Sequence, residues 1–287
     1  MVETSYIARS KEEALTIRKE VDCEILAGGT DMMVQNKRGV EITPKFKKPV
    51  LFISSLEELK GIEVFADRIE IKALTVSSAI AACEAMPYFV KTAASLMGAI
   101  SLRNSATIGG NIANASPKGD LPQPLTLLDS LIELESLSGK RTMLVDEFII
   151  GAKKTALRSD EIISKIIVPI PKYTYGYYKK IGSRKANTIS KLTFSALIDL
   201  DGDIIKDIRF SSGSAGPKVA RSRENEEKYI GLSLSDLTDE KINEIALSHL
   251  ALLSPRAMPK YRKNATARML VHFLTEVRNK PNNSIIE

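Results

Sequence analysis

The sequence has too few cysteines for a cluster or a zinc site. It contains two, Cys23 and Cys83, whereas an iron–sulfur cluster needs about four thiolates. Neither cysteine belongs to a CxxC pair, which also argues against zinc. We therefore expect both residues to be buried or inert thiols.

Motifs for hydrolysis and for the common nucleotide folds are missing as well. The two histidines, His249 and His272, belong to no HExxH motif and have no cysteine nearby. Ser95 and Ser101 have no histidine near them, so a serine triad is not expected. Neither GxxxxGK[ST] nor GxGxxG occurs, which argues against a P-loop and a Rossmann dinucleotide site.

Long apolar runs are also absent, and none approaches the length of a membrane helix. The first residues, MVETSYIARSKEEAL, are polar and lack the apolar segment of a signal peptide, so we expect a cytoplasmic location.

The net charge of +6 is spread along the chain without a nucleic-acid-binding motif, and no nucleic-acid partner is expected. With 287 residues, of which 44% are hydrophobic, the chain suits two or three folded units.

Two glycine-rich motifs stand out among the residues that are present. The first, AGGTD at Ala27–Asp31, lies between an expected strand at Glu24–Ala27 and a helix through Met32–Val34, with Thr30 or Asp31 as its cap. This layout is common where a helix N-terminus binds an anion. The second motif is TIGGNIANASPKGD at Thr107–Asp120, which we interpret as a loop.

The rest of the pattern predicts an α+β chain. Strands are expected at Pro49–Ser54, Asp67–Leu74, Leu131–Ser136, Lys140–Val145, Ile162–Val168, Tyr173–Ile181, Thr193–Leu200 and Ile204–Ser211. Helices are expected at Lys11–Glu20, Thr75–Ala85, Leu121–Leu128, Pro217–Ile230, Thr238–Ser248 and Pro259–Val277. Pro169–Pro171 is a plausible domain boundary, and residues 279–287 read as a loose tail.

Both glycine motifs suit a diphosphate ligand. Without a Cβ, glycine lets backbone N–H groups approach a ligand closely, and successive N–H groups form an anion-binding nest. Two such loops facing each other could surround both phosphates, and Asp120 could accept from a sugar-chain hydroxyl. The alternative is that these glycines only form tight turns.

At this point the residues resemble a known family. AGGTD and TIGGNIANASPKGD are similar to the two FAD loops of the flavoprotein (medium) subunit of the molybdenum hydroxylases, the carbon monoxide dehydrogenase and xanthine dehydrogenase family. The similarity continues in order through DEIISKIIVPIP, YYKKIGSRKANTISKL and SSGSAGPKVARSRENEE, and covers nearly the whole chain. It implies the two-subdomain FAD-binding fold of the carbon monoxide dehydrogenase flavoprotein and vanillyl-alcohol oxidase type at residues 1–54 and 55–170. A C-terminal α+β domain at residues 171–287 would follow.

The resemblance also implies FAD as the cofactor and a set of contact residues. Those at matching positions are Ile25, Leu26, Ala27, Gly28, Gly29, Thr30, Asp31, Met32, Met97, Thr107, Ile108, Gly109, Gly110, Asn111, Asp120, Ile162, Lys180 and Ile189. Among them Ile162 would be an apolar contact near the adenine or ring end, Lys180 would lie near the flavin, and Ile189 would shield the isoalloxazine. No catalytic acid, base or metal ligand is implied on this chain.

The resemblance implies partners as well. A large molybdopterin subunit would oxidise the substrate, a small subunit would relay electrons through [2Fe–2S] clusters, and this chain would pass them to an external acceptor in a dimer of heterotrimers. The sequence leaves two alternatives open, a self-sufficient FAD-dependent oxidoreductase and a non-redox module that binds nucleotide diphosphates. The substrate of the complex and the acceptor are not determined by this sequence.

Overall fold

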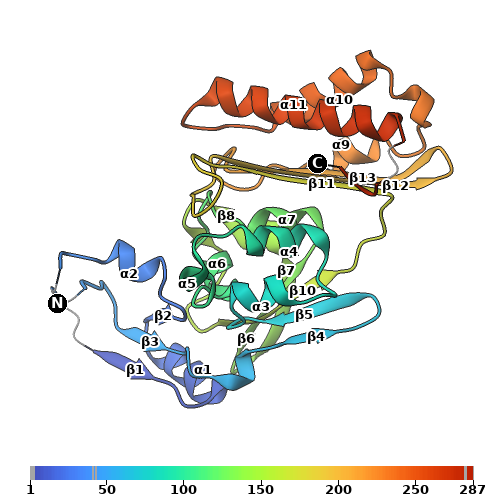
Figure 1. Cartoon of the computed structure of the whole chain (residues 1–287). Helices are drawn as coiled ribbons and strands as arrows, with labels where there is room; N and C mark the ends of the chain where they lie inside the picture. The colour runs from blue at the N-terminus through green and yellow to red at the C-terminus, as the bar shows by residue number, and fades with distance from the viewer. Residues whose placement is uncertain (1–3, 41, 43, 281–282, 287) are drawn as a thin grey trace.

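The computed structural model describes residues 4–40, 42, 44–280 and 283–286. In this part of the chain three units follow one another, and the middle unit lies between the other two (Figure 1). The domain limits at 54/55 and 170/171 stay a prediction, although every sheet falls inside one of the three expected ranges.

The N-terminal unit is a small parallel sheet with strand order β1-β3-β2 and a helix packed on it. Ser10 caps that helix by accepting a hydrogen bond from the backbone N–H of Glu13 at 3.1 Å. Ala14 and Leu15 lie on the apolar side of the helix and pack in the core of the unit. The elements are β1 (Ser5–Ile7), α1 (Lys11–Glu20), β2 (Glu24–Leu26), α2 (Met32–Gln35), β3 (Val50–Phe52) and the short η1 (Glu57–Leu59).

The middle unit has an antiparallel sheet, and its helices α4 and α7 lie between that sheet and the C-terminal unit (Figure 1). Its strand order is β4-β5-β10-β6-β7, so the last strand in sequence occupies the centre. The elements are β4 (Ile62–Val64), β5 (Arg68–Lys72), α3 (Ser77–Ala82), α4 (Tyr88–Ser95), α5 (Ile100–Arg103), α6 (Ile108–Ala113), α7 (Pro122–Leu127), β6 (Leu131–Ser136), β7 (Gly139–Leu144), α8 (Val145–Phe148), β8 (Ile149–Gly151), β9 (Lys154–Thr155) and β10 (Ile162–Pro169).

The C-terminal unit is a sheet of order β13-β12-β11-β14, covered on its outer face by α10 and α11 (Figure 1). Its β12–β13 hairpin turns at Gly202, whose φ of 60° suits glycine. The elements are β11 (Tyr175–Ile181), β12 (Leu192–Asp201), β13 (Ile204–Gly213), α9 (Arg223–Glu227), η2 (Leu234–Asp236), α10 (Asp239–Ala251), α11 (Pro259–Arg278) and β14 (Ile285–Ile286).

Helix α7 joins the middle unit to the C-terminal sheet through buried polar contacts. The Gln123 side chain is fully buried. Its Nε2 donates to the hydroxyl oxygens of Ser195 at 2.7 Å and Ser211 at 2.6 Å. Since such buried groups cost free energy when they lose their partners, the position of α7 on the sheet is closely defined.

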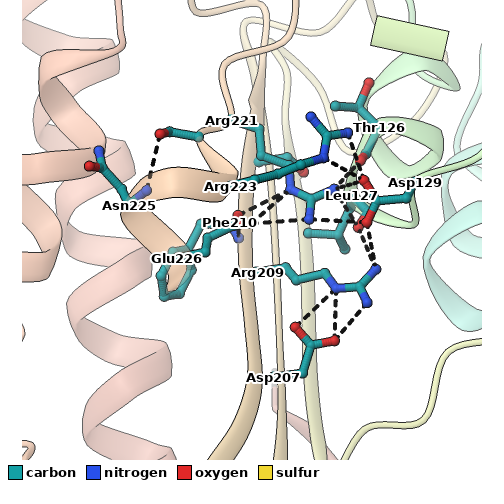
Figure 2. Close-up of polar contacts among 12 residues, drawn as sticks. Thr126, Leu127, Asp129, Asp207, Arg209, Phe210, Arg221, Arg223, Asn225 and Glu226 are labelled. Carbon is teal, nitrogen blue, oxygen red and sulfur yellow. Dashed lines mark hydrogen bonds and ion pairs between the residues drawn. The ribbon is translucent and has the colours of Figure 1, made fainter. Parts of the chain in front are cut away.

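The C-terminal end of α7 is held by a cluster of arginines from the C-terminal unit (Figure 2). Arg209, Arg221 and Arg223 all pair with Asp129, at 3.0, 2.8 and 2.6 Å. Arg221 also donates to the carbonyl oxygens of Thr126 and Leu127, which satisfies acceptors that the helix end leaves free. One carboxylate thus ties three cations of one unit to a helix of the other.

Three expectations about helices and about the end of the chain were wrong in detail. The helix expected at Pro217–Ile230 is limited to α9, because the backbone of Ala220 pairs in both directions with Ser212 of β13. The last described residues are not all loose, since β14 pairs in parallel with β11; residues 281, 282 and 287 lie outside the described part. In the middle unit, the helix expected at Thr75–Ala85 is shortened to α3.

His249 on α10 makes the stability of the C-terminal unit sensitive to acid. Burial lowers the pKa of His249 to about 4, and its Nε2 lies 2.8 Å from the Ser212 hydroxyl. An unfolded histidine has a pKa of about 6.5. The contribution of the neutral ring to the free energy of unfolding is therefore fully present above about pH 6.5. It is lost as pH falls towards 4, and the loss is about 3 kcal/mol at most.

We expect His249→Gln to remove this part of the acid sensitivity, measured as the free energy of unfolding in urea at pH 7 and pH 4.5. His272→Gln is the matched control, because His272 is exposed on the neighbouring helix. An equal loss of stability between the two pH values in the parent and in His249→Gln would contradict the prediction.

Candidate functional site

A cleft of about 360 Å³ lies between the N-terminal and middle units, and both glycine motifs line it. Its volume falls in the range of small-molecule sites. The expected site residues that line it are Ile25, Ala27, Gly28, Gly29, Thr30, Asp31, Met32, Thr107, Gly109, Gly110, Asn111 and Ile162.

The first motif provides free backbone donors. The chain leaves β2 at Leu26 and enters α2 after Asp31, and Gly29 between them has a φ of 68°. The N–H groups of residues 28–31 have no acceptor in the described part of the chain. The Asp31 side chain does not cap α2, contrary to one of the two expected caps. Successive unbonded N–H groups beside a cleft form an anion-binding nest.

Gly28 has a second role that the sequence did not indicate. A Cβ at this position would lie 1.8 Å from the carbonyl oxygen of Ser105, in the middle unit. The backbones of the two units therefore lie very close to each other beside the cleft, and Gly28 allows that approach.

The second motif is not the loop that we expected. Thr107 caps helix α6 by accepting a hydrogen bond from the N–H of Gly110 at 3.1 Å. The N–H groups of Ile108, Gly109 and Asn111 are bonded to the carbonyls of Thr75, Ala73 and Thr107. The N–H groups of residues 108–111 are thus already bonded, and the expected contact of this motif with a diphosphate stays a prediction.

The second motif instead contributes a side-chain group to the cleft. The Oδ1 atom of Asn111 is buried without a hydrogen-bond partner, while its Nδ2 lies 3.5 Å from the Met97 sulfur. A buried acceptor without a donor costs about 1–3 kcal/mol. A ligand with hydroxyl or N–H groups would remove that cost, and FAD carries both. The residues of the cleft thus fit this cofactor.

The rim of the cleft is bridged by charged and polar groups. Lys153, in the turn between β8 and β9, pairs with Asp31 of the first motif at 3.1 Å and donates to the side chain of Asn114, just after α6. Gln35 of α2 also donates to Asp31. This exposed bridge links the two motifs on the solvent side.

Asp120 and Lys180 do not line the cleft, and the structure pairs them with each other. Lys180 Nζ lies 2.8 Å from Asp120 Oδ2 and donates to the Leu96 carbonyl at 2.9 Å. Ser190 donates to the other carboxylate oxygen. Beside them, burial and then the Asp120 charge raise the pKa of Tyr178, whose hydroxyl has no partner among the described residues. A sugar hydroxyl that donated to Asp120 would therefore share its carboxylate with Lys180 and Ser190.

The remaining expected residues lie outside the lining. Leu26 and Ile108 are buried in the structure, and Met97 is buried against Asn111. Ile189 is 70% exposed on the loop before β12. A lining residue that sequence reasoning missed is Arg18. Its spacing of four from Ala14 and three from Leu15 places it on the buried side of α1, which was the available signal.

No histidine lines the cleft among the described residues. The same part of the chain holds no group of three or more His, Cys, Asp or Glu side chains placed to bind a metal ion. No described helix is both long and apolar enough to cross a membrane.

Two family models together match most of the chain. Residues 2–171 match the FAD binding domain in molybdopterin dehydrogenase, and residues 177–277 match the CO dehydrogenase flavoprotein C-terminal domain. The glyceraldehyde dehydrogenase medium chain of Sulfolobus acidocaldarius is 30% identical over 96% of this chain and 98% of the relative. The nicotinate dehydrogenase FAD-subunit of Eubacterium barkeri is 31% identical over 77% of this chain and 76% of the relative.

A solved structure gives the same fold. Carbon monoxide dehydrogenase from Hydrogenophaga pseudoflava matches with a TM-score of 0.84 and 23% identity, over 96% of this chain and 97% of that chain. This likeness confirms the expected α+β fold class, with an FAD-binding part and a C-terminal α+β part.

Proposed function

Because this chain belongs to the family of FAD-binding subunits of the molybdopterin dehydrogenases, we propose that it takes electrons from a [2Fe–2S] small subunit and passes them to an external acceptor. It is a flavoprotein subunit of an oxidoreductase, and its cofactor is FAD. The proposal includes a large molybdopterin subunit, assembly as a dimer of heterotrimers and a cytoplasmic location. The relative named a medium chain supports an assembly of several chains.

The observation that carries the proposal is the cleft with unbonded N–H groups on one wall and a buried, unpartnered amide oxygen on the other. When bound, FAD supplies the capacity to accept and release one or two electrons. We propose that residues 28–31 bind the diphosphate, that Asn111 accepts from a hydroxyl or N–H group, and that Ile25 and Ile162 exclude water. Met97, Asp120, Lys180 and Ile189 would then lie further along the cofactor.

The alternatives have less support. A self-sufficient oxidoreductase needs its own acid or base at the site. The described lining contains no histidine, tyrosine or lysine, and of its two carboxylates, those of Glu24 and Asp31, the second is paired with Lys153. A non-redox diphosphate module would use the same nest, but it does not account for the match to two flavoprotein models over most of the chain.

The test is anaerobic mixing of the FAD-loaded chain with the reduced [2Fe–2S] subunit of its complex, followed at the flavin absorption band. We expect rapid bleaching of that band, and its return when an acceptor is added. Bleaching by a small organic substrate or by NADH alone would favour the self-sufficient enzyme. Retention of ADP without retention of FAD would favour the diphosphate module.

A further inference from the structure

Arg18 joins the two walls of the cleft through backbone carbonyls. It lies in the last turn of α1 and is 7% exposed. Its Nη1 donates to the Cys23 carbonyl, in the N-terminal unit, at 2.6 Å. Its Nε and Nη2 donate to the carbonyls of Glu161 and Arg158, in the middle unit, both at 3.2 Å. The planar guanidinium fork suits acceptors that lie in different directions.

The charge of Arg18 has no carboxylate partner in the described part of the chain. The nearby Glu161 carboxylate pairs with Arg141 instead, at 2.6 Å. Arg18 is also the sole lysine or arginine among the described lining residues. A buried cation is costly unless it is compensated, and this one borders a cleft that takes a dianionic diphosphate.

Buried apolar side chains line the cleft together with Arg18. Ile53, Ile162 and Ile163 are 4%, 0% and 7% exposed, and Leu157 lies beside them. The flavin half of the cofactor has to remain within reach of electron donors and acceptors. The adenosine half has no such requirement, so the part of the cleft lined by these buried apolar side chains suits it better.

We propose that Arg18 is a positioning residue that sets the spacing of the two walls at the adenosine end of the FAD cleft and provides the cation for this cleft. Cys23 precedes the strand of one wall, and Glu161 directly precedes β10 of the other. A change in the Arg18 fork therefore alters the width of the cleft without removing a group that touches the redox ring. The inference rests on FAD binding and does not depend on the electron transfer proposed above.

Arg18→Lys and Arg18→Met separate spacing from charge. Lysine keeps the positive charge but lacks the planar guanidinium that donates to three carbonyls. Methionine has neither the charge nor the hydrogen-bond donors. The readouts are the dissociation constants of FAD and of ADP for the purified chain, by titration calorimetry, together with the melting temperature without ligand. We expect Arg18→Lys to weaken the binding of FAD and the binding of ADP by the same factor, about tenfold, because two hydrogen bonds between the walls are lost. Arg18→Met should weaken both further.

Arg262→Lys is the matched control. Arg262 is also a buried arginine, 8% exposed, which donates to a backbone carbonyl, that of Ser214, but it lies in the C-terminal unit and does not line the cleft. We expect it to lower the melting temperature and to leave both dissociation constants within about twofold of the parent.

Two outcomes would overturn the inference. One is FAD and ADP binding within about twofold of the parent in Arg18→Lys. The other is weakening in Arg18→Lys that Arg262→Lys reproduces at an equal loss of melting temperature, since this would mark a general effect of stability. If Arg18→Met does not fold, Arg18→Lys alone decides the spacing role. Failure of electron transfer with normal FAD binding would count against the proposed function and leave this inference intact.

Discussion

Gly28→Ala is expected to lower the affinity for FAD by about 100-fold, the largest effect that we expect from a single added methyl group. The new Cβ would lie 1.8 Å from the Ser105 carbonyl oxygen, and real Cβ atoms essentially never approach another atom below 3.0 Å. Because the obstacle is backbone, a side-chain rotation cannot relieve the contact. The two units have to separate at the cleft, at a cost of about 3 kcal/mol.

The measurement is FAD titration of the purified variant, with the melting temperature determined with and without FAD. Gly151→Ala is the matched control, because a Cβ at Gly151 would meet no atom within 4 Å. We expect Gly151→Ala to bind FAD as the parent does. Equal FAD affinities in the two variants would show that the contact between Gly28 and Ser105 does not define the cleft.

Asp129→Asn is expected to have the second-largest effect, a loss of about 2 kcal/mol in the free energy of unfolding. Breaking a fully buried ion pair costs about 3–5 kcal/mol, and the 32% exposure of the Asp129 side chain reduces this. Three guanidinium groups would lose their shared carboxylate (Figure 2). Asparagine is the appropriate replacement, because Asp129 has a φ of 53° and asparagine tolerates this conformation.

The pH dependence gives an independent check on Asp129. Burial alone would raise its pKa, but Arg221 and Arg223 outweigh burial and hold the pKa below its usual value. The contribution of Asp129 is therefore present above the unfolded pKa of about 3.9 and lost as pH falls below it. Urea unfolding at pH 7 and pH 3 should show a smaller difference in Asp129→Asn than in the parent. Asp207→Asn removes a carboxylate that, among the described residues, pairs with Arg209 alone, and it should cost less. An equal cost would contradict the shared role of Asp129.

The sequence predicted those parts of the molecule that depend on local pattern. Helix α1 has the expected bounds because Ser10 and the 3.6-residue periodicity both act within one turn or two. The layout around Gly28 and Gly29 was also predicted, since the strand, the glycines and α2 are adjacent in sequence; the motif lines the cleft, and its contact with the cofactor stays a prediction. The family assignment from the two motifs is confirmed by the family models.

The parts that were missed depend on contacts between distant residues. The pairing of Asp120 with Lys180 spans 60 positions, and the Arg18 contacts with Glu161 and Arg158 span 143 and 140. No local pattern encodes such partners. The second motif was misread because its glycines suggested a flexible loop, whereas Gly109 fits close to Ala73 inside the first turns of α6.

The strand order of the middle sheet has a consequence for how the cofactor is acquired during synthesis. β10 is the last strand of that sheet to be made, yet it lies at the centre, between β5 and β6. Ile162 and Ile163 of this strand also line the cleft. A nascent chain that ends between residues 120 and 161 contains both glycine motifs but has no central strand to hold them in place. We therefore expect FAD to be incorporated only after β10 has been synthesised, although the first glycine motif is complete by residue 31.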